Sequence, residues 1–274
     1  MPALDAATSR GPNGETLLRP IMPNAGIAAE YRRRLLALID QMGASVLWWV
    51  RSAYRARPPE MATDASPARE LAGIVAKLRR YWERRFDRAA KELAEYFATA
   101  VGERVDATLK SILRRGGFAV PFRPTRAMND VMAGSVEENV SLIKSIPRQH
   151  LQQVQGIVMR GVQTGRDAGQ ISKDLQEQLG VTKRRAALIS MDQSEKTTAS
   201  LNRARQIEMG IEFGIWQHSG AGREPRESHV KAGRDAVRFS LRDGWLDPAI
   251  GKRIWPGTEI NCRCCWRPVI PGDL

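Results

Sequence analysis

The residues best suited to bind a metal ion gather near the end of the sequence. All three cysteines lie there, with two of the three histidines. Residues two apart in an extended strand project from the same face, so Cys262 and Cys264 could direct both sulfurs to one ion. His229 is the candidate third ligand. A closed zinc site needs four ligands, and the candidates for the fourth are Cys265, His218 and Glu259.

An apolar core is the alternative interpretation of this segment. Four of the seven tryptophans lie there, and reduced cysteines commonly behave as small buried apolar side chains. A disulfide framework is disfavoured, because cysteines at adjacent or next-but-one positions rarely meet the geometry of a relaxed bridge. We therefore expect either a zinc site or reduced thiols in an apolar cluster.

A metal-dependent nuclease is a third interpretation of this part of the sequence. His218, Glu227, His229 and Asp235 could be arranged into a metal-dependent nuclease. Such an enzyme needs an open metal position, whereas paired thiolates ordinarily build a closed structural site. The sequence also has neither the glycine-rich loop that cradles a nucleotide phosphate nor the nucleophile elbow of serine hydrolases. We expect a protein that is not an enzyme and has no catalytic residues.

The order of motifs in this segment resembles that of the phage Mu F-like minor head proteins. The matching residues are Trp216, the pair Arg226 and His229, Gly233 with Phe239, Pro256-Gly257, and Asn261-Cys262-Arg263-Cys264. The preceding helical stretch is also similar, from Asp192-Gln193 through Asn202 and Arg205-Gln206 to Gly210. The likeness runs from about residue 165 to the end. Family members usually have Ala-Arg before the Asp-Gln pair, where this chain has Ser190-Met191, so no role of that arginine carries over.

The resemblance implies a structural component of the head of a tailed phage or prophage. Such a protein would act in head assembly near the portal, bind the portal protein and other head components, and reside in the virion after assembly in the host cytoplasm. Its mechanism would be binding and not turnover. The alternative function is a nucleic-acid-processing enzyme, such as a metal-dependent nuclease.

A formal net charge of +13 over 274 residues favours anionic partners, and nucleic acid is the commonest polyanion that a soluble protein meets, with membrane surfaces as the competing explanation. The arginines we predict to contact double-stranded DNA are Arg79, Arg80, Arg84, Arg85 and Arg88. They alternate with aromatic residues that we expect to lie in the core. An acidic protein surface is the alternative partner. No apolar run is long enough to span a bilayer, and the start lacks the pattern of a secretory signal.

Apolar residues at helical spacing predict a series of helices separated by glycine and proline. Pro147 is expected to separate two of them, and Thr182 to cap the last. The predicted helices cover about residues 30–57, 66–100, 103–115, 125–145, 149–164, 170–179 and 182–208. Glycines and prolines at residues 116–124 predict a hinge or loop.

These patterns predict an α+β protein with a long-helix N-terminal body followed by a small C-terminal α+β module. Residues 1–24 have no apolar periodicity and are expected to form a flexible arm. The helical body would span residues 25–210. The Mu F-like module would span residues 211–274, where short apolar runs and tryptophans replace the helical pattern.

Overall fold

The computed structural model describes residues 8–11, 14–56, 66–118, 120–123, 125–165, 168–221 and 224–271. The chain forms two compact units. Unit 1 draws on Met1–Ala28, Phe97–Ser135 and Met191–Leu274, and unit 2 on Ala29–Tyr96 and Val136–Ser190. All four long helices contribute residues to both units, so the units do not follow the predicted division at residue 210.

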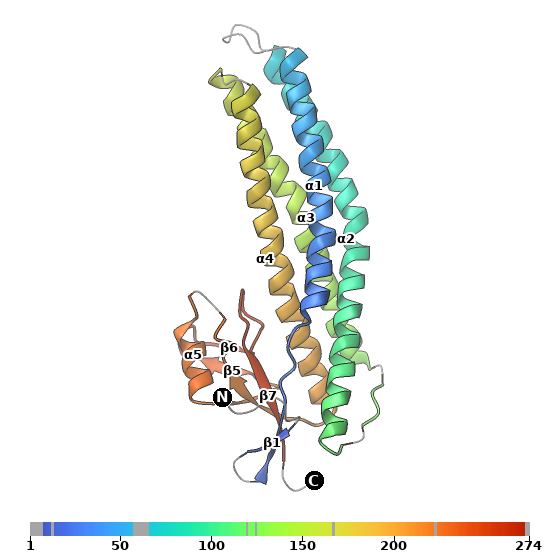
Figure 1. The fold of residues 1–274 in the computed structure, drawn as a ribbon, viewed down its shortest axis with the longest axis vertical. Helices are drawn as coiled ribbons and strands as arrows, with labels where there is room; N and C mark the ends of the chain where they lie inside the picture. The colour runs from blue at the N-terminus through green and yellow to red at the C-terminus, as the bar shows by residue number, and fades with distance from the viewer. Residues whose placement is uncertain are drawn as a thin grey trace. The chain divides into compact units, whose positions relative to one another are not determined.

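Four long helices account for most of the described residues (Figure 1). They are α1 (Ala25–Ala56), α2 (Ser66–Arg115), α3 (Arg126–Gln163) and α4 (Ala168–Glu208). The start of α2 lies where the sequence predicted it, but the helices predicted at 66–100 and 103–115 form one continuous helix. Pro58 and Pro59, which were expected to end the first helix, lie outside the described residues.

Two predicted helix breaks are wrong. Pro147 lies inside α3, where it removes one backbone hydrogen bond of the helix. The helix continues because apolar residues on both sides, Ile146 and Leu151, are buried in unit 2. Thr182 lies inside α4 and donates its hydroxyl to the carbonyl of Gln178 instead of capping a helix. In both places burial of an apolar face outweighs the local preference for a break.

The core of unit 2 is built on one face of α1. Its buried residues follow each other at intervals of three or four, which is the spacing of a helix face that packs against neighbouring helices. They are Tyr31, Leu35, Ile39, Met42, Val46, Val50 and Tyr54. The hydroxyl of Tyr31 donates to Asn139 Oδ1 of α3 over 2.9 Å. Trp49 of the same helix is 47% exposed.

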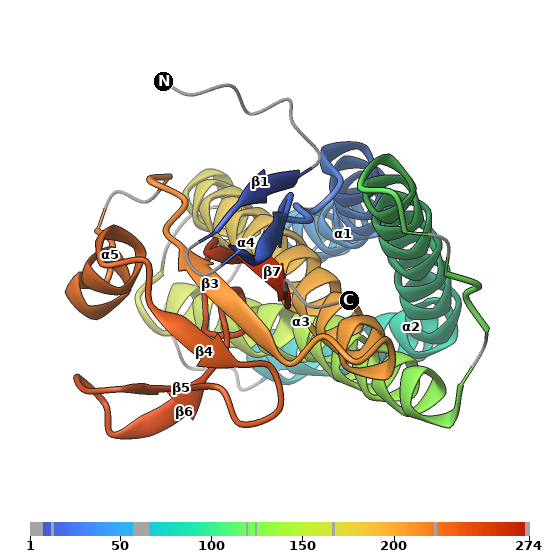
Figure 2. The same cartoon turned by 90° about the horizontal axis from the view of Figure 1, so that it is seen from below.

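Unit 1 contains a five-stranded sheet of order β1-β2-β7-β3-β4 in which every pairing is antiparallel (Figure 2). Its strands are β1 (Thr8–Arg10), β2 (Thr16–Leu18), β3 (Phe213–Gln217), β4 (Arg238–Ser240) and β7 (Cys265–Ile270). A second sheet pairs β5 (Trp245–Asp247) with β6 (Lys252–Ile254). The short helix α5 (Glu227–Arg234) follows β3.

The first two strands correct the expectation of a flexible arm. Residues 8–10 and 16–18 belong to the sheet, and β2 pairs with β7 through Thr16 opposite Ile270. Leu18 is 0% exposed. Runs of three residues are too short to show alternation, so no pattern in residues 8–10 or 16–18 predicts a strand.

Helix α4 is joined to β7 by buried polar side chains within unit 1. Trp266 Nε1 donates to Gln206 Oε1 over 2.8 Å, and Gln206 Nε2 donates to Asn202 Oδ1 over 2.6 Å. On the same helix, Arg205 donates to both carboxylate oxygens of Asp106, at 2.8 and 2.7 Å. Two parallel bonds from a guanidinium to a carboxylate fix both distance and orientation. These contacts set the position of β7, from which the candidate site is built.

The α+β fold class is confirmed, with long helices followed by a small antiparallel module toward the C-terminus. The predicted break at 116–124 coincides with the interval between α2 and α3, where Gly117 has a φ of 88°. Among the described residues, none of the helices combines the length and hydropathy needed to cross a membrane.

We expect Leu18→Ala to destabilise unit 1 by about 3 kcal/mol, because truncation of a fully buried leucine leaves a cavity. Urea unfolding followed by tryptophan fluorescence measures the change. Met22→Ala is the matched control, since Met22 is 50% exposed. Equal effects of both substitutions would contradict a packed role for β2.

His150 predicts an acid sensitivity of unit 2. Its ring is 2% exposed, its Nδ1 lies 2.8 Å from Thr182 Oγ1, and burial lowers its pKa to about 4. In the unfolded chain the pKa is about 6.5, so below that pH the unfolded state binds the extra proton first. Stability is therefore complete above pH 6.5 and falls as the pH drops toward 4, by at most about 3 kcal/mol.

We expect His150→Gln to flatten this dependence, because glutamine does not titrate. Hydrogen exchange of peptides from α1, measured at pH 7 and pH 5, reports the stability of unit 2. The control is His218→Gln in unit 1. An unchanged pH dependence in His150→Gln would show that other groups cause it.

Candidate functional site

Helix α5 carries His229 into the interior of unit 1. His229 and Ala232 are the buried residues of this eight-residue helix. The close approach of α5 to the end of β3 depends on Gly233, because a Cβ there would lie 2.7 Å from the backbone nitrogen of His218. The ring of His229 packs edge-on against Trp216 of β3, with 5.1 Å between centroids.

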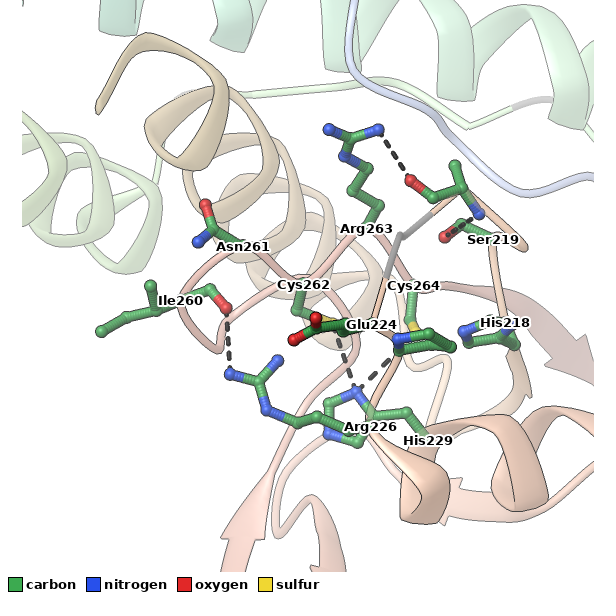
Figure 3. Close-up of a pocket in the computed structure, with 12 residues that line it drawn as sticks. His218, Ser219, Glu224, Arg226, His229, Ile260, Asn261, Cys262, Arg263 and Cys264 are labelled. Atoms are coloured by element: carbon green, nitrogen blue, oxygen red, sulfur yellow. Dashed lines mark hydrogen bonds between the residues drawn. The ribbon is translucent and has the colours of Figure 1, made fainter. Parts of the chain in front are cut away.

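Cys262 and Cys264 lie in the loop that leads into β7. The loop turns at Gly257, with a φ of 82°, and at Asn261, with a φ of 57°. Glycine suits the first position, and asparagine tolerates the left-handed region better than most residues. The backbone N–H of Cys262 donates to the carbonyl of Glu259, which closes the turn. These turns bring both sulfurs to the side of the loop that faces α5 (Figure 3).

The predicted trio converges. Cys262 Sγ lies 3.5 Å from His229 Nδ1, and Cys264 Sγ lies 3.8 Å from the same nitrogen. One ligand atom from each of the three residues falls within 4.8 Å of the others, and all three residues are buried. The expectation that residues 262 and 264 face the same side holds, although they precede the strand. We call this group the His229–Cys262–Cys264 cluster.

Asp247 stands on the opposite side of the histidine ring. Its Oδ2 lies 3.5 Å from His229 Nε2, which is longer than a regular hydrogen bond, and this nitrogen has no hydrogen-bond partner among the described residues. The carboxylate is 1% exposed and is held by Ser228 Oγ, which donates over 3.0 Å, and by the N–H of Ala249, which donates over 2.9 Å. A carboxylate in this place favours the proton on Nε2 and leaves the lone pair of Nδ1 toward the sulfurs.

The electrostatics of the cluster favour one thiolate. The side-chain hydrogen bond with Cys264 lowers the pKa of Cys262, whereas the bond to Cys262 and burial raise the pKa of Cys264. Burial, together with the charge of Cys262, also raises the pKa of Glu195 on α4 to about 7.

A cavity of about 340 Å³ opens beside the cluster. Its walls include all three residues of the cluster and carry both signs of charge, from Glu224, Arg226 and Arg263 (Figure 3). Arg226 donates to the carbonyl of Ile260, and Arg263 donates to the carbonyl of Ala221. The two arginines thus brace the loops around the cavity.

The three predicted candidates for a fourth ligand are not part of the cluster in the described chain. Cys265 lies on β7, where its sulfur contacts Gln217 Oε1 at 3.8 Å and burial raises its pKa to about 12. His218 lines the cavity, and its Nδ1 accepts the N–H of Gly220. Glu259 contributes its backbone carbonyl to the turn at Cys262.

The arginines predicted to contact DNA lie on the part of α2 that belongs to unit 2. Arg80, Arg84 and Arg88 are exposed and recur every four residues, so they line one face of the helix. Arg79 is partly buried and donates to Gln155, and Arg85 donates to Gln41. Of the interleaved aromatics, Trp82 and Phe86 are buried as expected, whereas Tyr81 is exposed.

Sequence reasoning missed Asp247 and Glu195. The stretch Asp247-Pro248 is a turn signal, and the side chain does accept the N–H two residues later, but this pattern does not reveal a contact with His229. Glu195 lies on α4 among polar residues that gave no reason to expect burial. The four catalytic candidates do not gather, because Glu227 and Asp235 are exposed while His229 is buried.

We expect Gly233→Ala to lower the melting temperature of unit 1 by several degrees, since the added methyl would meet the backbone of His218. Differential scanning calorimetry measures the shift. The matched control is Gly73→Ala, because Gly73 lies in α2 with nothing within 4 Å of the added carbon. That substitution should raise helix stability slightly. Similar behaviour of both variants would contradict the close approach at Gly233.

The chain is 36% identical over 153 residues to an uncharacterized protein of Haemophilus influenzae. The matched region covers 54% of this chain and 31% of the relative. No solved structure matches the chain. The family model described as phage Mu protein F like protein matches residues 152–267, which include α4, α5 and the whole cluster. Residues 152–267 are therefore similar to the phage Mu F-like proteins, as the motifs predicted.

Proposed function

We propose that this chain is a minor head morphogenesis protein of a tailed phage or prophage and acts as a structural component near the portal. The observation that carries the proposal is the family match over residues 152–267. The residues behind that likeness hold unit 1 together. Trp216 and Trp266 are buried in the core, Gln206 bonds to β7, and Gly233 allows α5 to approach β3.

The proposed mechanism is assembly by binding. The chain spans 31% of the length of its Haemophilus relative, so the role of the whole protein is part of this proposal. Its partners would be the portal protein and other head components, and its place the virion, after assembly in the host cytoplasm. Long helices with exposed charged faces offer extended surfaces for such contacts.

Deletion of the gene in a phage or inducible prophage tests this function. We expect fewer filled heads by electron microscopy and a lower yield of infectious particles, both restored by the wild-type gene in trans. Mass spectrometry of purified wild-type particles should detect the protein. Normal heads without it, together with its absence from particles, would overturn the proposal.

A nuclease assay tests the alternative function, a metal-dependent nuclease. Purified full-length protein is incubated with linear DNA in Mg²⁺ or Zn²⁺, and we expect no cleavage. Cleavage that is lost in His229→Gln would replace the structural role with an enzymatic one.

We also propose that the protein contacts packaged DNA. The net charge of +13 and the exposed row of Arg80, Arg84 and Arg88 support it. Arginines four apart on a helix present a line of positive charge that suits a phosphate backbone without sequence preference. Arg79 and Arg85 already have side-chain partners, so they would contribute less.

We expect replacement of Arg80, Arg84 and Arg88 by glutamine to flatten the salt dependence of DNA binding. Each lost phosphate contact changes the slope of log affinity against log salt by about 0.9, so three contacts would change it by about 2.7. Filter binding to a random-sequence duplex between 50 and 200 mM salt measures the slope.

The control removes three charges from unit 1, through Lys231→Gln, Arg234→Gln and Arg242→Gln, all at exposed positions. This variant should keep the wild-type slope. Equal slopes for wild type and the α2 variant would exclude this helix from DNA binding.

A further inference from the structure

The His229–Cys262–Cys264 cluster has the chemistry of a transition-metal site. Two thiol sulfurs and one imidazole nitrogen are soft and borderline ligands that select zinc over magnesium or calcium. We propose that the cluster binds one Zn²⁺ through these three side chains, with Asp247 as a positioning residue and the fourth coordination position open to the adjoining cavity. This inference is independent of the proposed role in a phage head.

The distances fit a tetrahedral ion. With Zn–S near 2.3 Å and Zn–N near 2.05 Å, tetrahedral geometry separates a sulfur from a nitrogen ligand by about 3.6 Å and two sulfurs by about 3.8 Å. The two sulfur-to-nitrogen distances here are 3.5 and 3.8 Å. All three ligand atoms lie within 4.8 Å of one another, so a bound ion would draw the two sulfurs together by at most about 1 Å.

Asp247 supplies the feature that separates a metal site from an ordinary buried histidine. Ligating histidines usually direct their other ring nitrogen to a carboxylate, which fixes the tautomer. Asp247 Oδ2 faces Nε2 at 3.5 Å, and the carboxylate is itself held by Ser228 and Ala249. Nε2 is buried with no hydrogen-bond partner among the described residues.

The open position follows from the surroundings of the cluster. Among the described residues, this group contains three potential metal ligands. The cavity of about 340 Å³ touches all three and has room for water or a small anion as the fourth ligand. Arg226 and Arg263 in its walls would favour an anion. Three protein ligands and an exchangeable fourth are typical of reactive zinc, whereas structural zinc is closed by a fourth side chain.

The metal content of the full-length protein tests the site. We expect one zinc per chain by mass spectrometry after purification and dialysis. Cys262→Ser, Cys264→Ser and His229→Gln should each reduce this at least tenfold, while the matched control Cys265→Ser keeps it. Because these variants could fail to fold, chelator is also added to wild-type protein. It should change the fluorescence of Trp216, which packs on His229. Wild-type protein that neither retains added zinc nor responds to chelator would overturn the proposal.

The open position and the role of Asp247 have separate readouts. In cobalt-substituted protein, thiocyanate should shift the visible absorption of the metal, since it enters the open position. His218→Gln, Glu224→Gln and Glu259→Gln should each leave zinc affinity within about threefold of wild type. A tenfold loss in one of them, with no response to thiocyanate, would show a closed site. Asp247→Asn should bind zinc 10- to 100-fold more weakly but keep the cobalt spectrum. Unchanged affinity would remove Asp247 from the site.

Discussion

The hydrogen bond between Trp266 and Gln206 is the contact on which the rest of unit 1 depends. Both side chains are buried. The side-chain oxygen of Gln206 accepts a hydrogen bond from Trp266, and its nitrogen donates one to Asn202. Loss of one partner would leave a buried polar group unsatisfied, at a cost of about 1–3 kcal/mol. Because β7 lies between β2 and β3, the same bond positions the sheet, the loop before β7 and both cysteines of the cluster.

The sequence was sufficient for the elements with strong periodicity and for the proximity of His229, Cys262 and Cys264. Helical spacing predicted the long helices, and the alternation of Cys262 and Cys264 predicted two sulfurs on one side. It was insufficient where packing opposes local preference. Pro147 and Gly180 lie within helices because the apolar faces on either side are buried. Strands of three residues, such as β2, carry too few positions for a pattern.

The candidate site was also predicted only in part from the sequence. His229, Cys262 and Cys264 were found because their residue types are rare and specific, whereas Asp247 is one of many carboxylates in the chain. Its significance comes from a hairpin of β5 and β6 that brings it to His229, and no local pattern encodes that approach. The Mu F-like segment also crosses the two units, since residues 152–190 belong to unit 2 and residues 191–267 to unit 1. Family boundaries and packing boundaries therefore differ in this chain.

The pairing of β2 with β7 constrains the order in which the chain folds during synthesis. Arg267 of β7 donates to the carbonyl of Leu18, a contact that spans 249 residues of sequence. Until the ribosome has added those residues, β2 has no neighbour on that side and Leu18 no core to enter. Unit 2, whose last residue is Ser190, is complete much earlier. Closing so long a loop is slow compared with packing neighbouring helices. In the nascent chain, the helices of unit 2 would thus be packed before β2 can pair with β7. During this interval the unpaired edge of β2 is available to other chains.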